Sequence, residues 1–493
     1  MTASTTAHRT LLAAPYVVTV DAARRVLEDG AVLVRGAVIE AVGFRAELES
    51  MAPEAERLPL AGHVILPGFV DGHLHATQTL ARGIADDIDE VAVRWGWDRV
   101  FPWEAALEDD DVYVSGLLTA VELVRNGVTC FADPGAFRMN PIARAVAESG
   151  IRALLTVGCM DTWPAGFPLP AAMVHENPTG WALDASERLV EDWHGRADGR
   201  IRGGYSIRVL MNASERFVRE IGRRARARNL TVQIHLAVSA DRVEWVVRRT
   251  GRRPVEYLEH LGVLGPNWLL AHLGWVHETE IPILARRGVS VCHAPGSSMH
   301  NARGAISRGK FPELAAAGIN LCLGADAAAA NNSLDMFRTM YLTCLAHNEA
   351  HVRFAIFPPE RVLEMATRGG ARALLWDDEI GSLEPGKRAD LIAVDLRRSS
   401  LSPVYDFSLV PNLVYSGSGA DVTFAMVDGR ILMRDRAITF VDERALVARA
   451  QACGERLLER VPYRLRPRWP VVTRHGPEAP MTSSRASARG APP

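Results

Sequence analysis

The stretch that decides the fold is LPGFVDGHLH, residues 66–75, an apolar run that ends in a His-x-His pair. A short apolar run of this kind, rich in valine, phenylalanine and leucine, predicts a buried strand. Because side chains alternate between the two faces of a strand, His73 and His75 would point the same way at its end. Two converging imidazoles can bind one metal ion, but two surface histidines would give the same pattern. The metal interpretation therefore depends on further ligands elsewhere in the chain.

Alternating strand and helix patterns follow this segment and predict a parallel barrel. Helical periodicity occupies residues 110–126, 140–149, 214–228 and 276–287, between apolar segments that predict strands. Eight strands that alternate with helices are the number that closes a (β/α)8, or TIM, barrel, whose active sites lie at the C-terminal ends of the strands. The predicted strands end at His73 and His75, Asp133, Gly158, Arg208, His235, His272, His293 and Asp326.

The two ends of the chain predict a second, smaller unit of an α/β protein. Short β-rich pieces separated by glycines occur in residues 10–62 and again in residues 389–433, and we expect them to meet in one small β-sandwich. The predicted domains are therefore 1–62 and 379–440 for the sandwich, 63–378 for the barrel, 441–463 for a C-terminal helix and 464–493 for a tail. The tail is rich in Pro, Arg, Ser and Ala, which predicts disorder.

The composition is that of a globular protein with a sizeable core: 493 residues, 48% hydrophobic and 23% charged. The formal net charge of −2 gives no sign of nucleic-acid binding. None of the six cysteines forms a Cys-x-x-Cys motif. The sequence also lacks a signal-peptide core and any apolar run of about 18 residues. We therefore expect a cytoplasmic protein that binds neither nucleic acid nor membranes.

Four of the predicted strand ends offer metal ligands. The first supplies His73 and His75, and three others supply His235, His272 and Asp326. Each residue alone could be a hydrogen-bonded core or loop residue. Together, at matching ends of one barrel, they predict a site for one divalent metal ion. Imidazoles with one carboxylate suit Zn²⁺ best and Fe²⁺ as the alternative, with room for a water molecule.

Several longer motifs carry a family resemblance. The chain resembles the amidohydrolase superfamily, in the branch that contains triazine chlorohydrolases and aminohydrolases, guanine and 8-oxoguanine deaminases, and adenosylhomocysteine deaminases. The resemblance runs from about residue 10 to 460 and rests on these motifs: LPGFVDGHLH, TLARGIADD, NGVTCFADPG, TVQIHLA, LLAHLGWVHETEI, CHAPGSSM, LGADAAAANNSLDM and GSLEPGKRADLIAVD.

The resemblance implies roles for individual residues. It implies that four of them hold a single metal: His73, His75, His235 and Asp326. It implies that His272 contacts the metal-bound water and that His293 lies near the substrate. Gln78 matches a position where several purine-acting relatives hold a substrate-orienting glutamine, although it could equally cap the first loop. The resemblance also implies a small-molecule substrate and a homo-oligomer, either a dimer or a tetramer.

Three departures from the family pattern bear on the reaction. The family usually reads His-Leu-Ala-Glu-Thr at the fifth strand, and here Val238 stands in place of the glutamate. In deaminating relatives that glutamate shuttles a proton, which valine cannot do. Nearby Asp241 and Glu244 lie farther along the chain. The other departures are Ala327 where glycine is usual, and the run 294–298 where relatives read Cys-Pro-Thr-Ser-Asn.

These observations predict a metal-dependent amidohydrolase that acts on carbon–nitrogen bonds other than peptide bonds. A metal-activated water would attack a C–N, or related C–X, bond of a small heterocyclic substrate beside Val238. Asp326 would accept the proton and His272 would stabilise the developing charge. One alternative is a purine- or triazine-type deaminase with another proton shuttle, and another is a metal-dependent biosynthetic enzyme that does not hydrolyse. A non-catalytic metal-binding scaffold is less favoured, because every expected ligand is retained.

Overall fold

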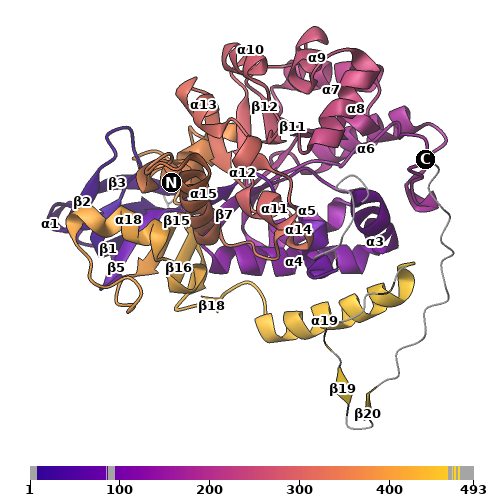
Figure 1. The fold of residues 1–493 in the computed structure, drawn as a ribbon. Helices are drawn as coiled ribbons and strands as arrows, with labels where there is room; N and C mark the ends of the chain where they lie inside the picture. Colours follow the sequence, from indigo (N-terminus) through magenta and orange to yellow (C-terminus); the bar gives the residue numbers. More distant parts are fainter. Residues whose placement is uncertain are drawn as a thin grey trace, which may run out of the picture.

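A computed structural model describes residues 8–84, 86, 95–462, 464, 469, 471–473 and 476–477. Its centre is a barrel of eight parallel strand positions, as predicted. Figure 1 shows helices around these strands. Backbone hydrogen bonds join the first strand to the last, among them Gly72 N to Leu323 O at 2.8 Å. The strands are β6 (Phe69–Asp71), β7 (Val128–Asp133), β8 (Arg152–Leu155), β9 (Ile201–Gly203) with its continuation β10 (Tyr205–Val209), β11 (Val232–Leu236), β12 (Trp268–His272), β13 (Ser290–His293) and β14 (Asn320–Leu323).

Helices surround the barrel and follow the predicted periodicity closely. The predicted helix 214–228 is α7 (Glu215–Arg228), which begins where the Ser214 hydroxyl accepts a hydrogen bond from Phe217 N. After the last barrel strand the chain forms α16 (Pro359–Glu364), a π-turn and α17 (Gly370–Ala373). The other helices around the barrel are α3 (Phe101–Ala106), α4 (Asp109–Arg125), α5 (Asn140–Ser149), α6 (Pro178–Trp193), α8 (Ala240–Thr250), α9 (Pro254–His260), α10 (Ile281–Arg287), α11 (Pro295–His300), α12 (Ala305–Arg308), α13 (Phe311–Ala316), α14 (Ala328–Asn331) and α15 (Met336–His351).

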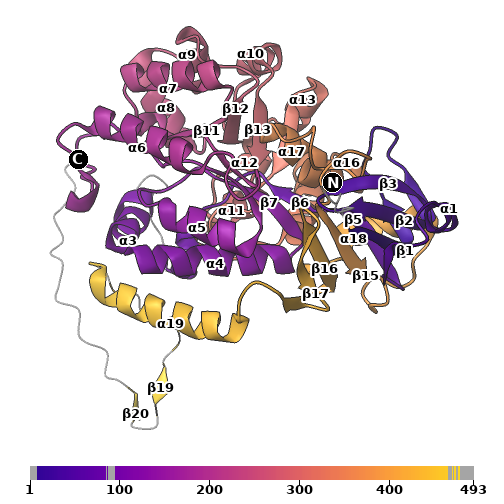
Figure 2. The same ribbon diagram turned by 180° about the vertical axis from the view of Figure 1, so that it is seen from behind.

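The two ends of the chain meet in one nine-stranded sheet beside the barrel, with α1 (Arg45–Met51) and α18 (Leu409–Tyr415) near it (Figures 1 and 2). The strand order is β18-β17-β16-β15-β5-β1-β2-β3, and β4 pairs with β1. The strands are β1 (Arg9–Val18), β2 (Val26–Arg35), β3 (Val38–Phe44), β4 (Glu56–Pro59), β5 (His63–Pro67), β15 (Leu391–Asp395), β16 (Val422–Val427), β17 (Arg430–Arg434) and β18 (Ala437–Ile438).

The apolar run 66–75 was predicted to form one strand, and the structure corrects this prediction. It is divided at Gly68 into β5, which belongs to the nine-stranded sheet, and β6, which belongs to the barrel. Gly68 allows the close approach of the next barrel strand, because a Cβ atom there would lie 2.0 Å from Thr129 Oγ1. The junction between the two units therefore falls at Gly68, five residues after the predicted boundary at residue 63, and His73 and His75 follow β6.

The predicted C-terminal helix is α19 (Glu443–Arg460), which lies along α4 in both views (Figures 1 and 2). Arg460 Nη2 is 2.6 Å from Asp111 Oδ2, and Cys453 is fully buried at this contact. The predicted disordered tail, 464–493, lies outside the described residues except for a few positions, which include the short pair β19 (Val472–Thr473) and β20 (Gly476–Pro477). Within the described ranges, no helix has the length and apolar character needed to span a bilayer.

Candidate active site

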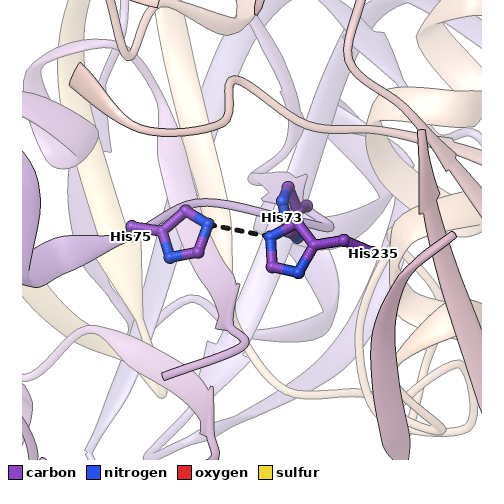
Figure 3. A group of neighbouring side chains, drawn as sticks. All are labelled: His73, His75 and His235. Carbon is purple, nitrogen blue, oxygen red and sulfur yellow. Dashed lines mark hydrogen bonds between the residues drawn. The ribbon is translucent and has the colours of Figure 1, made fainter. Parts of the chain in front are cut away.

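Five predicted residues converge at the C-terminal mouth of the barrel. His73 and His75 follow β6, His235 lies on β11, His272 ends β12, and Asp326 lies just after β14. Figure 3 shows how the first three rings face one another, with His75 Nε2 3.1 Å from His235 Nε2. Asp326 Oδ1 lies 3.7 Å from His73 Nε2 and 3.6 Å from His75 Nε2, and its Oδ2 lies 3.8 Å from His272 Nε2.

The spacing of these atoms fits one divalent ion. Ligands at roughly 2.0–2.2 Å from a tetrahedral zinc lie about 3.3–3.6 Å from one another. The distances above, from 3.1 to 3.8 Å, lie close to this spacing. The buried His73 Nε2 atom also has no hydrogen-bond partner, as expected of a lone pair reserved for a metal. The ligand atoms of His73, His272 and Asp326 form a second compact group, which shares His73 with the first.

The protonation states also suit metal binding. His235 Nδ1 lies 2.7 Å from the carbonyl oxygen of Arg208, which can only accept, so Nδ1 carries the proton and Nε2 is free. Burial, reinforced by the neighbouring histidines, lowers the pKa of His235 well below its ordinary value and keeps the ring neutral. Burial alone would raise the pKa of Asp326. The nearby His272, His73 and Arg303 outweigh this effect, lower the pKa and keep the carboxylate ionised.

The backbone at two of these residues is strained. His272 has φ = 75° and Asp326 has φ = 64°, both in the left-handed region that non-glycine residues rarely adopt. Asp326 is held there by its own N–H, which donates to the His73 carbonyl at 2.8 Å, and by Ser297 Oγ, which donates to Oδ2 at 2.6 Å. Strain of this kind is characteristic of functional sites. Ser297, which the run 294–298 shares with the family pattern, thus supplies a hydroxyl that positions Asp326.

A cavity opens beside the five residues. Aromatic side chains form part of its wall, Val238 lies in the wall, and Asp326 is the sole carboxylate among the lining residues that the structure describes. Asp241, the first acidic residue after Val238 along the chain, is not among the residues that line the cavity. The described lining residues are His75, Gln78, Trp95, Gly96, Trp97, Val100, Phe101, Arg208, Val209, Asn212, His235, Val238, Arg242, His272, Arg303 and Asp326.

Gln78 and His293, both predicted near the substrate, occupy different places. Gln78 lines the cavity, and its Nε2 donates to Glu104 Oε1 at 2.8 Å while its own Oε1 has no partner. His293 is absent from the lining residues that the structure describes. Its Nε2 lies 3.1 Å from His347 Nε2, and its ring packs against Phe311 with the ring centroids 3.8 Å apart.

Three arginines that line the cavity were not predicted from the sequence as site residues. The sequence marks Arg208 only as the end of a strand, whereas in the structure its guanidinium forms a buried ion pair with Glu104, with Nη2 to Oε1 at 2.8 Å. Arg242 and Arg303 line the cavity from α8 and from the segment after α11. None of these residues belongs to a recognisable motif. The position of Arg208 at a strand end was the one available signal.

Comparison with known proteins identifies the relatives of this chain. The sequence profile of the amidohydrolase family matches residues 64–432. The 5'-deoxyadenosine deaminase of Methanosarcina barkeri is 36% identical over 448 residues, which cover 90% of this chain and 98% of that protein. The 5-methylthioadenosine/S-adenosylhomocysteine deaminase of Syntrophobacter fumaroxidans is 36% identical over 428 residues, with 87% and 93% covered.

Solved structures show the same fold. A zinc-bound adenosine deaminase from Xanthomonas campestris has 29% sequence identity and a TM-score of 0.80, with 91% of this chain and 98% of that chain covered. A zinc complex of atrazine chlorohydrolase from Arthrobacter aurescens has 22% identity and a TM-score of 0.79, with 90% and 100% covered. At this lower identity the second match supports the fold alone.

Proposed function

Because this chain belongs to the amidohydrolase family and is a hydrolase of carbon–nitrogen bonds, we propose that it cleaves such a bond in a small planar heterocycle with Asp326 as its one carboxylate proton carrier. The observation that carries this proposal is the cavity wall. Among the lining residues that the structure describes, Asp326 is the only acid, and Val238 stands where the family pattern places a glutamate. Valine has no titratable atom and can neither accept nor donate a proton.

The metal in this proposal is one divalent ion, with zinc favoured and Fe²⁺ as the alternative. The residues that would hold it are His73, His75, His235 and Asp326, whose donor atoms have the spacing described above. A divalent ion bound there lowers the pKa of a water molecule toward neutrality and so supplies the nucleophile. The solved zinc-bound relative from Xanthomonas campestris supports this choice of metal.

The residues of the chain handle the proton. Asp326 is ionised, and its Oδ2 can accept the proton of the attacking water and return it to the leaving nitrogen. Ser297 Oγ, 2.6 Å from Oδ2, and the backbone N–H of Ala327, 2.8 Å from Oδ1, fix the direction of the carboxylate. His272 Nε2, 3.8 Å from Oδ2, is placed to donate to the oxygen on which negative charge develops.

Binding of a planar ring follows from the aromatic wall and from Gln78. Trp95, Trp97 and Phe101 line the cavity, and Trp97 Nε1 donates to the Phe167 carbonyl at 2.7 Å. Glu104 holds the amide of Gln78 so that Nε2 is occupied and the unpaired Oε1 can accept a ring N–H. Gln78 is therefore proposed as a substrate-orienting residue.

A second candidate is deamination of an adenosine-type substrate. The two relatives at 36% identity are named deaminases, which favours this candidate. Deamination of such rings requires a proton on a ring nitrogen, and position 238 cannot deliver it. Substrates whose leaving group departs without ring protonation, such as cyclic amides or amidines, fit the cavity chemistry better. A positioned general acid typically raises the rate by a factor of about 10² to 10⁴, so its absence should make deamination slow.

The test is a panel of amino-heterocycles and cyclic amides, run on the zinc-loaded wild type and on Val238→Glu and Val238→Gln. We expect hydrolysis of cyclic amides and slow ammonia release from amino-heterocycles, with at least a tenfold gain in ammonia release for Val238→Glu and no gain for the matched glutamine variant. Wild-type deamination at about 1–10³ s⁻¹ would establish the second candidate instead.

The predicted homo-oligomer and cytoplasmic location stay predictions.

A further inference from the structure

The catalytic cavity contains an arginine that forms no ion pair with any residue that the structure describes. Of the three arginines in the wall, Arg208 is paired with Glu104, with Nη2 to Oε1 at 2.8 Å. Arg303 Nη1 lies 3.4 Å from Asp326 Oδ2 and 3.0 Å from Ser297 Oγ. Arg242 makes no ion pair with any described carboxylate, and its buried Nε has no hydrogen-bond partner.

The surroundings of Arg242 are unfavourable for a cation in three ways. It is the third residue of α8, at the positive end of the helix dipole. Burial lowers its pKa to about 10, and the charges of Arg303 and Arg208 add to this effect, while the carboxylates of Asp241 and Asp326 partly offset it. The guanidinium is nevertheless still charged at neutral pH. Arg242 is only part-buried, but a cation in a cavity wall that lacks an ion-pair partner is preorganised for an anion.

Val238 contributes to this arrangement. Val238 and Arg242 both line the catalytic cavity and a smaller adjoining pocket, so the two side chains share a wall. A glutamate at position 238 would place a carboxylate on that wall and compete for Arg242. The valine leaves the guanidinium without a carboxylate at position 238.

We propose that the substrate is an anion, a planar heterocycle carrying a carboxylate or phosphate group that Arg242 binds beside Val238. The inference rests on the proposed function, because it names the substrate class of the same site. The planar fork of a guanidinium can donate two parallel hydrogen bonds to either oxyanion. Arg303 adds a second positive charge to the same wall, while its attachment to Ser297 and Asp326 keeps it directed toward the metal ligands.

The first experiment measures binding by calorimetry to the metal-free protein, so that neither hydrolysis nor ligation of a metal affects the result. The probes are matched pairs, orotate with uracil and nicotinate with nicotinamide, together with inorganic phosphate. We expect at least one anion to bind ten times more tightly than its neutral counterpart or, for phosphate, than chloride. Arg242→Met should weaken that binding about 10- to 100-fold, the usual range for a charged hydrogen bond.

Arg242→Lys should keep part of the affinity, and Arg249→Met, on the exposed side of the same helix, should leave it unchanged. Preference for carboxylates over phosphate, or the reverse, identifies the anion. If no anion binds more tightly than its neutral counterpart, or if Arg242→Met binds them equally well, the inference is overturned. The proposed function would survive that result, since the hydrolysis panel and the metal content are measured separately.

A second measurement does not depend on choosing the right ligand. Removing an unpaired cation from a positive cluster should raise the melting temperature of the unliganded protein, whereas removing a structural arginine should lower it. We therefore expect Arg242→Met to melt at a higher temperature than the wild type. Arg208→Met should melt at a lower temperature, because it leaves the buried carboxylate of Glu104 without its ion-pair partner. A lower melting temperature for Arg242→Met would assign Arg242 to the fold instead of to the substrate.

Discussion

His73 lies closest to the centre of the five-residue cluster, since its ring is within about 5 Å of the rings of His75, His235 and His272. We expect the purified protein to contain about one zinc or iron ion per chain and His73→Ala to lose most of it, because one donor is removed and the geometry is broken. Elemental analysis measures this, with the exposed His260→Ala as the control. Full metal occupancy in His73→Ala would contradict the ligand assignment.

Asp326 has two tasks, and its isosteric amide tests both. Asp326→Asn cannot accept a proton and is a poorer ligand, so turnover should fall by about 10² to 10⁴ or more while the fold persists. His272→Ala should also abolish turnover through the loss of a donor to the developing charge. Rates on the best substrate of the panel, with circular dichroism as the folding control, decide the matter. Either variant at near wild-type rate would remove its residue from the mechanism.

The residues that sequence reasoning identified and those that it missed differ in physical kind. The histidines and Asp326 could be predicted, because they end apolar strands and the barrel brings all such ends to one mouth. Arg242 and Arg303 could not, because they lie on a helix and a loop whose directions depend on packing. His293 also ends a strand, yet the structure pairs it with His347 on α15, a contact that no local pattern signals.

At the scale of elements, Gly68 explains where the strand prediction succeeded and failed. An apolar run predicts a strand correctly, but nothing in its hydrophobicity reveals that β5 and β6 belong to different sheets. The division depends on the contact of Gly68 with Thr129, which lies on β7 and far along the chain. The eight barrel strands and most helices were predictable, because their periodicity is local.

Gly68→Ala tests this contact. The new methyl group would overlap the Thr129 side chain, and we expect the free energy of unfolding to fall by about 1–3 kcal/mol. Gly454→Ala in α19 is the matched control, because a Cβ there meets nothing within 4 Å and should stabilise the helix by roughly 0.5–1 kcal/mol. Urea denaturation measures both. Equal stability of Gly68→Ala and the wild type would show that β5 and β6 can enter different sheets without a glycine between them.

At the scale of the whole molecule, buried histidines make stability depend on pH. Burial lowers the pKa of His347 to about 4, and His351 adds to the effect, whereas in the unfolded chain a histidine titrates near 6.5. The unfolded state therefore binds the proton first as the pH falls. The stability contributed by the neutral ring is complete above pH 6.5 and is lost progressively toward pH 4.

His347→Gln should reduce this loss, because glutamine has no proton to gain. Between pH 7 and pH 4 we expect the fall in unfolding free energy to be smaller than in the wild type by on the order of 3 kcal/mol, the equivalent of the shift in pKa. Urea denaturation at several pH values gives the slopes, and the exposed His260→Gln should keep the slope of the wild type. Identical slopes for wild type and His347→Gln would show that His347 is protonated in the folded protein.

The pairing of β5 also governs when the metal site can mature during synthesis. β5 leads through Gly68 into β6 and so to His73 and His75, and it is clamped between β1 and β15. β1 leaves the ribosome before β5, but β15 (Leu391–Asp395) follows the last strand of the barrel. Because domains fold as their segments emerge, the first two metal ligands gain their final support after every other ligand has been made. Loading of the metal is therefore expected to be a late event, which follows translation of the barrel rather than guiding it.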